Sequence, residues 1–182
     1  MPSRARLMTA HAEAALAQIA SRVVDHRQLM RLDNAANPAR RRLRQPLQAR
    51  HVNALVDLVA VAESFASGRL LELRPAVSPD DVSTWQKRKN AWGKHGSVDI
   101  TAYKAWSALM GFVEVRNALQ HGLGRLTERQ LGKHRNEILA QIRASSVHLD
   151  GDLLVVLADD VAQCGKVCAG FVQWLDAAAP TV

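Results

Sequence analysis

Hydrophobic residues recur every three or four positions along most of the chain, the spacing of one face of an α-helix. The spacing predicts a first helix over residues 5–32 and a second over residues 50–66, with Gly68 near the expected C-terminal stop of the second. The segment between them, residues 33–49, contains two prolines and a run of arginines. Such a composition predicts a loop or an extended basic connector.

Three further helices follow in the middle of the chain. A short one starts around residues 78–81, where serine, proline and two aspartates suit a first turn. The next covers residues 99–121, with Asp99 as its N-cap. The third begins at Thr127, where a capping-box spacing occurs, and runs to about Arg143.

The end of the chain has a different pattern. Residues 147–157 are rich in β-branched and aliphatic residues around an Asp-Gly pair, which predicts a two-stranded hairpin. Asp159 and Asp160 then cap a last helix, whose predicted buried stripe consists of Val161, Cys164, Cys168, Phe171 and Leu175. We therefore expect an all-α antiparallel bundle of about five or six helices with one small late hairpin, in a single domain over residues 1–182.

Composition narrows the class of protein. The 182 residues are 48% hydrophobic but only 4% aromatic, so aliphatic residues and alanine must fill the core. The sequence contains no run of about 18 apolar residues, so no membrane span is predicted. The N-terminus has no apolar stretch typical of a secretion signal. With two cysteines, Cys164 and Cys168, a disulfide framework is not indicated. We expect a cytoplasmic protein without a membrane partner.

The formal net charge of +7 favours a polyanionic partner such as nucleic acid, although an arginine-rich composition also arises in GC-rich genomes. The basic connector could form an RNA-tracking patch, but a solvated loop is the interpretation we prefer. Its four arginines are Arg40, Arg41, Arg42 and Arg44.

Candidate chemistry gathers at the end of the helix over residues 99–121. Arg116 supplies a guanidinium fork suited to phosphate, His121 exchanges a proton near neutral pH, and Asn117 can orient either group. Five positions on an ideal helix correspond to about 140° of rotation and ~7.5 Å of rise, so Arg116 and His121 do not share a face. They can converge if the helix distorts or if a second copy contributes partner groups. On residue types alone, both side chains could simply complement the helix dipole.

The segment from Arg116 to His121 resembles the Arg-x4-His signature of the HEPN superfamily, with asparagine directly after the arginine. Residues 121–127, the hairpin and the last helix are similar to the ribo-L-PSP-associated branch of that superfamily. The resemblance implies a HEPN-like bundle that forms a homodimer through the motif helices. It also implies a metal-independent endoribonuclease without a cofactor, acting in toxin–antitoxin, abortive-infection or antiviral defence systems, beside a cognate regulator or another defence-system partner protein.

Carried over residue by residue, Arg116 and His121 form the catalytic pair and Asn117 supports them. The ribose 2′-OH would attack phosphorus, with His121 as general base or acid and Arg116 stabilising the transition state. Members regulated by nucleotidyl transfer have a tyrosine where this chain has Leu123, so that regulation is not expected. A non-catalytic module that dimerises and binds RNA or a protein is the alternative.

Other residues are weaker candidates. Arg125 could contact RNA, and Glu114 could tune His121 or serve as an ordinary ion-pair partner. Two tryptophans, Trp85 and Trp92, could stack bases beside basic neighbours, but packing in the core or at a dimer interface is the preferred interpretation. The two cysteines are interpreted as small core residues rather than metal ligands.

Overall fold

The computed structural model describes residues 7–36 and 44–180, without the side chains of residues 33–36 and 44–48. Within this part of the chain, seven α-helices and one two-stranded antiparallel hairpin are present. The predicted all-α class with a late hairpin is therefore confirmed.

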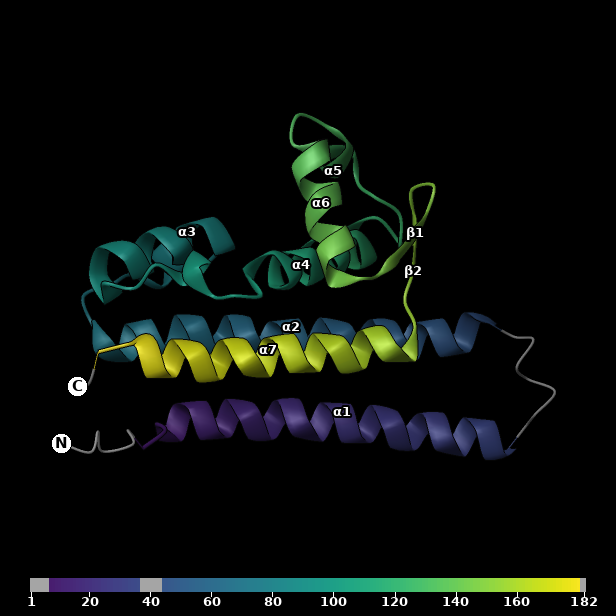
Figure 1. Ribbon diagram of the computed structural model, residues 1–182, viewed down its shortest axis with the longest axis horizontal. Helices are drawn as coiled ribbons and strands as arrows, with labels where there is room; N and C mark the ends of the chain where they lie inside the picture. Colours follow the sequence, from purple (N-terminus) through teal and green to yellow (C-terminus); the bar gives the residue numbers. More distant parts are fainter. Residues whose placement is uncertain (1–6, 37–43, 181–182) are drawn as a thin grey trace.

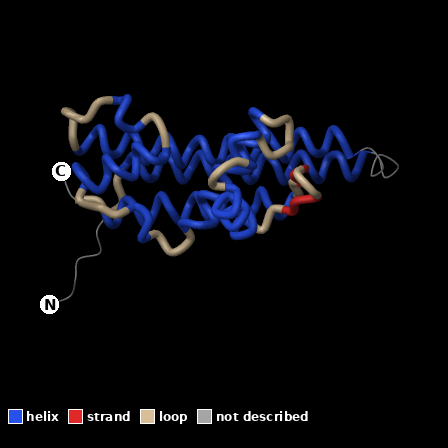
Figure 2. Tube along the Cα trace, turned by 90° about the horizontal axis from the view of Figure 1, so that it is seen from above, coloured by secondary structure: helices blue, strands red, loops and turns tan. Residues whose placement is uncertain are grey.

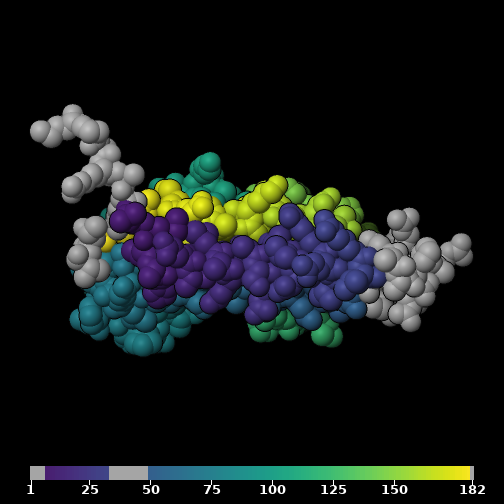
Figure 3. All heavy atoms as spheres, turned by 90° about the horizontal axis from the view of Figure 1, so that it is seen from below, coloured from purple at the N-terminus to yellow at the C-terminus, as the bar shows by residue number. Residues whose placement is uncertain are grey.

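Three long helices form one side of the molecule: α1 (Ala10–Ala36), α2 (Arg44–Leu73) and α7 (Ala158–Ala178). Each packs against the other two. Figure 1 shows α2 and α7 running in one direction and α1 in the other. Seen from below, α1 covers much of the surface, with part of α7 visible beside it (Figure 3).

The remaining helices lie on the opposite side of α2 and α7 (Figure 1). Here α3 (Trp85–Ala91) is followed by α4 (Trp106–His121), and α6 (Arg135–Ser145) crosses α4 with extensive contact. Figure 2 shows the same arrangement from above, with the hairpin near one end of α6. The helix that carries the motif is thus held between α2 and α6.

The hairpin pairs β1 (His148–Asp150) with β2 (Leu153–Val155), as the sequence predicts. Gly151 occupies its turn with a φ of 63°, a conformation that favours glycine. In α7, Asp160 accepts a 2.7 Å hydrogen bond from the backbone N–H of Leu157, and the predicted stripe from Val161 to Leu175 is buried.

Several boundaries differ from the predictions because tertiary contacts override local signals. Gly68 does not end α2, which continues to Leu73. A Cβ at Gly68 would lie 2.9 Å from the His11 imidazole, so the glycine permits α1 to approach closely. The predicted connector over residues 33–49 is also shorter, since α1 extends to Ala36 and α2 begins at Arg44.

The start of the motif helix is a second correction. Asp99 caps a short 3-10 turn, Ile100–Ala102, by accepting a 3.0 Å hydrogen bond from the N–H of Thr101. The backbone leaves the helical region at Tyr103, whose hydroxyl donates to the Val167 carbonyl oxygen in α7 at 3.0 Å. Because this hydrogen bond fixes Tyr103 against α7 in a non-helical conformation, α4 begins only at Trp106.

Two other predicted helices are interrupted. The capping box between Thr127 and Gln130 is present, but α5 (Glu128–Leu131) ends before Gly132, and α6 is a separate helix. The segment after Ser78 forms a 3-10 turn before α3, whose own N-cap is Thr84, and the first helix starts at Ala10 rather than at residue 5.

Trp85 and Trp92 are buried in the interior, in agreement with the core interpretation. Trp92 is fully buried and its indole N–H donates to the Ala66 carbonyl oxygen at 2.9 Å, while the Trp85 ring meets that of Phe171 edge to face. Cys164 and Cys168 are buried with their sulfur atoms 3.9 Å apart, and burial raises the pKa of the Cys164 thiol. Within the described ranges, no group of three metal-ligating side chains occurs.

Candidate functional site

The end of α4 is positioned by a close crossing with α6. A Cβ on Gly111 would lie 2.0 Å from the backbone carbonyl oxygen of Gln141, so only glycine permits this separation. Leu109 and Phe112 of α4 are fully buried. The crossing fixes where residues 114–121 emerge from the core.

Arg116 is held by a carboxylate from another helix. Its Nη1 donates to Oε2 of Glu63 at 3.0 Å, and its Nη2 donates to Oε1 at 2.8 Å. This two-pronged geometry is the strongest form of arginine–carboxylate contact. The Arg116 and Glu63 side chains are only 19% and 14% exposed, so water screens the pair weakly.

A second arginine approaches the same carboxylate. Arg88 Nη1 lies 3.6 Å from Oε1 of Glu63, and Arg88 Nε donates to the Ser67 hydroxyl at 2.8 Å. The Arg88 guanidinium also lies over the Trp85 ring, 5.2 Å from its centroid. Burial lowers the pKa of Arg88, and the neighbouring Arg116 charge acts in the same direction.

This arginine–glutamate cluster, formed by Glu63, Arg88 and Arg116, contains two cations and one anion. It also has spare hydrogen-bond donors. Arg116 Nε, Arg88 Nη1 and Trp85 Nε1 are buried and have no hydrogen-bond acceptor in the described part of the protein. Buried donors without acceptors are uncommon in folded proteins, so these three set the cluster apart from an ordinary core contact.

A groove of about 640 Å³ lies beside the cluster, between α2, α3, α4 and α6. Arg116 and Asn117 line it, together with Glu63. The other lining residues are Ser83, Thr84, Trp85, Gln86, Met110, Val113, Glu114, Arg129, His134, Glu137, Ile138 and Gln141. Its ionised lining residues are two arginines and three glutamates, so the groove wall is mixed in charge rather than uniformly basic.

His121 occupies a different position. It is the last residue of α4, it is exposed, and it is not among the residues that line the groove. A single chain therefore brings Arg116 and Asn117 together but leaves His121 outside. A site that uses both charged groups requires a second copy of the chain or a movement of the helix end.

The turn after α4 places a leucine beside His121. Leu123 is 93% exposed and has a φ of 52°, in the left-handed region that non-glycine residues rarely adopt. Gly122 makes this turn tight, since a Cβ there would lie 2.0 Å from the Arg125 carbonyl oxygen. An exposed apolar side chain, two residues after His121, is thus held in a strained backbone conformation.

The weaker candidates, Glu114 and Arg125, pair with other residues in the structure. Glu114 accepts a 2.8 Å hydrogen bond from Gln130 and lies 3.6 Å from Arg129, so its partners are these residues rather than His121. Arg125 forms an exposed ion pair with Asp152 in the hairpin turn. Three residues of the basic patch, Arg40, Arg41 and Arg42, lie outside the described residues, and of Arg44 only the backbone, in α2, is described.

Sequence reasoning missed Glu63, and it considered Arg88 only as a basic neighbour of Trp85 and Trp92. Glu63 is 53 positions from Arg116, and nothing in the spacing predicts that they meet. A signal is present nevertheless: Glu63 is the one acidic residue in the otherwise largely apolar stretch over residues 58–71. A lone carboxylate in such a stretch usually has a buried partner.

Comparisons with protein-family models, with curated proteins and with solved structures found no match for this chain. None of the described helices has the length and apolar character needed to cross a membrane. The function must therefore be inferred from the residues at the end of α4 and their surroundings.

Proposed function

We propose that this protein is a metal-independent endoribonuclease of the HEPN type that acts as a homodimer through the ends of its α4 helices. The observation that carries the proposal is the placement of the motif. Arg116 and Asn117 line an open groove, while His121 is exposed where α4 ends. The exposed Leu123 beside His121 supplies an apolar contact for a second copy around a two-fold axis.

The proposed reaction uses the nucleophile that RNA carries. The ribose 2′-oxygen attacks the adjacent phosphorus, His121 accepts the hydroxyl proton, and the bond from phosphorus to the 5′-oxygen breaks. The leaving 5′-oxygen takes a proton from water, and the protonated imidazole returns its proton to the solvent, so one His121 and one Arg116 complete a site. Arg116 stabilises charge on the phosphoryl oxygens, supported by the excess positive charge of the cluster. The products are a 2′,3′-cyclic phosphate and a 5′-hydroxyl.

Substrate and setting follow from the same proposal. The net charge of +7 favours RNA as the polyanionic partner, and cytoplasmic RNA is the substrate we expect. An enzyme that cleaves cellular RNA must be restrained, so we place it among toxin or phage-defence effectors that are controlled by a cognate partner protein.

One observation favours a non-catalytic alternative. Because Glu63 occupies both terminal nitrogens of Arg116, the guanidinium has a structural role that needs no RNA. In that case the chain would dimerise and bind RNA or a protein without cleaving it.

An assay in EDTA separates the two functions. The protein is incubated with RNA, with DNA of the same sequence, and with RNA that carries 2′-deoxy substitutions. We expect cleavage of the unmodified RNA alone, and a loss of at least about 100-fold in rate for His121→Ala. His148→Ala is the matched control, since His148 is also exposed but lies on strand β1 and does not line the groove beside Arg116. Cleavage of DNA, or unchanged activity in His121→Ala, would contradict the proposal.

A further inference from the structure

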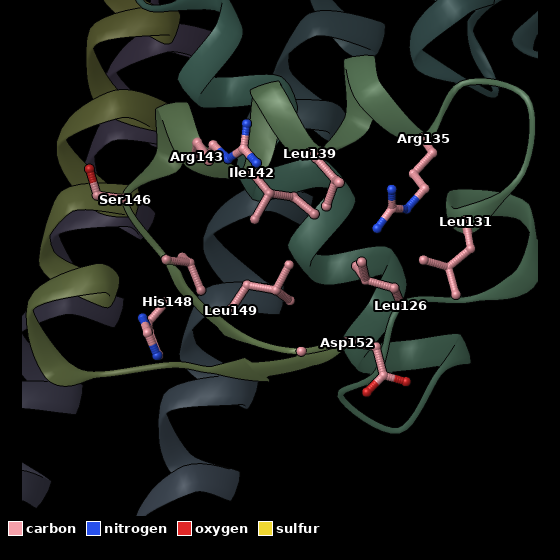
Figure 4. A pocket seen from close by; sticks show the side chains of 12 residues that line it. Leu126, Leu131, Arg135, Leu139, Ile142, Arg143, Ser146, His148, Leu149 and Asp152 are labelled. Atoms are coloured by element: carbon pink, nitrogen blue, oxygen red, sulfur yellow. The ribbon is translucent and has the colours of Figure 1, made fainter.

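A second groove, of about 690 Å³, lies between α6 and the β-hairpin (Figure 4), and neither Arg116 nor Asn117 lines it. Its floor is aliphatic: Leu126, Ile142 and Val147 are buried, and Leu139 is half-buried. Leu131 at one end is 41% exposed. In Figure 4 the leucine side chains face a common space.

One face of α6 forms the wall of this groove. Arg135, Leu139 and Arg143 are spaced four residues apart, so they lie on successive turns of the same face. The rise from the first arginine to the second is about 12 Å. An apolar centre is thus flanked by two cations.

The two arginines are uncompensated. Arg135 and Arg143 are exposed and make no ion pair with any residue in the described ranges. Asp152, the acidic residue among those lining the groove, is paired with Arg125, and Figure 4 shows its carboxylate pointing away from the leucines. The groove therefore presents net positive charge around an apolar floor.

We propose that this groove binds an amphipathic helix of a partner protein, with leucine-type residues flanked by acidic residues two turns apart. Because the two arginines start about 12 Å apart along α6, two anions spaced seven or eight residues apart on a second helix match their spacing. A small carboxylate ligand would reach only one arginine. Laying the apolar face of a helix into a groove is an established mode of recognition.

This inference is independent of the proposed ribonuclease activity, but the geometry connects the two sites. Arg135, Leu139 and Arg143 face the second groove, whereas His134, Ile138 and Gln141 of the same segment line the first. The α6 helix is thus a shared wall. A helix bound on one side of α6 lies directly behind the groove that contains Arg116.

The probe is a fluorescein-labelled synthetic helical peptide with glutamates about seven residues apart and leucines between them. Binding to the full chain is measured by fluorescence anisotropy. We expect Arg135→Glu combined with Arg143→Glu to weaken binding at least about tenfold. A peptide with lysines in place of the glutamates should bind this double variant better than it binds the unmodified chain.

Arg27→Glu with Arg31→Glu is the matched control, because it makes the same change of charge on exposed arginines of α1, on the far side of the molecule. It should leave binding within about twofold. Equal loss in both double variants would show attraction by net charge alone and would overturn the proposal. A change of oligomeric state in the Arg135/Arg143 variant, measured by sedimentation, would also overturn it, because the groove would then hold a second copy of the chain.

Discussion

Glu63→Ala is expected to destabilise the protein by about 3–5 kcal/mol, because it removes the one anion from a cluster with two mostly buried guanidinium groups. Arg116 would lose both of its hydrogen bonds to the carboxylate, and Arg88 would lose its ion pair. Since neither side chain can reach water freely, their charges would remain buried without compensation. Urea denaturation followed by circular dichroism measures the loss directly.

Glu137→Ala is the control for that experiment. Glu137 lines the same groove, but its side chain is 67% exposed and lies 3.7 Å from a similarly exposed His134. We expect a change within about 0.5 kcal/mol. If Glu63→Ala costs no more than Glu137→Ala, the cluster does not hold the end of α4 in place.

Gly111→Ala is expected to destabilise the fold by about 3 kcal/mol, although the same change in an isolated helix is stabilising. The added Cβ would lie 2.0 Å from the Gln141 carbonyl oxygen and 2.9 Å from the Ser145 Cβ. The first of these is backbone in α6 and cannot rotate away, so the two helices must separate. The separation would also displace Arg116 from the groove. Thermal and urea unfolding measure the effect.

Gly93→Ala tests whether the effect comes from the close approach. Nothing lies within 4 Å of a Cβ built at Gly93, and its φ is not in the left-handed region. We expect neutral behaviour or a gain of about 0.4–1 kcal/mol. A Gly111→Ala protein as stable as Gly93→Ala would show that α4 and α6 do not cross as closely as described.

The elements of the fold follow from local patterns, whereas several of their ends do not. The Asp-Gly turn of the hairpin, the capping box at Thr127 and the buried stripe of α7 are encoded within a few residues of where they act. Gly68 and Asp99 carry ordinary stop and start signals that the structure does not use in that way. Packing against His11 and the anchoring of Tyr103 to α7 decide those boundaries, and sequence spacing contains neither contact.

The residues of the candidate site were likewise predictable only in part. Arg116 and Asn117 were identified from the motif, and both line the groove. Their surroundings come from α2 and α3, because Glu63 and Arg88 meet Arg116 only after the helices pack. The helical geometry of five positions already predicted that His121 would diverge from Arg116, and the structure places it outside the groove. No local sequence pattern predicts which surface a second copy of the chain would contact.

Complementation between two inactive variants tests the proposed composite site most directly. Arg116→Ala and His121→Ala proteins are mixed, allowed to exchange subunits, and assayed for RNA cleavage in EDTA. Arg116→Ala leaves Glu63 with Arg88 as a partner, which limits its effect on folding. A site shared between two chains predicts that the mixture cleaves RNA faster than either variant alone. Cleavage by the mixture no faster than by the separate proteins, with mixed dimers present, would contradict a shared site.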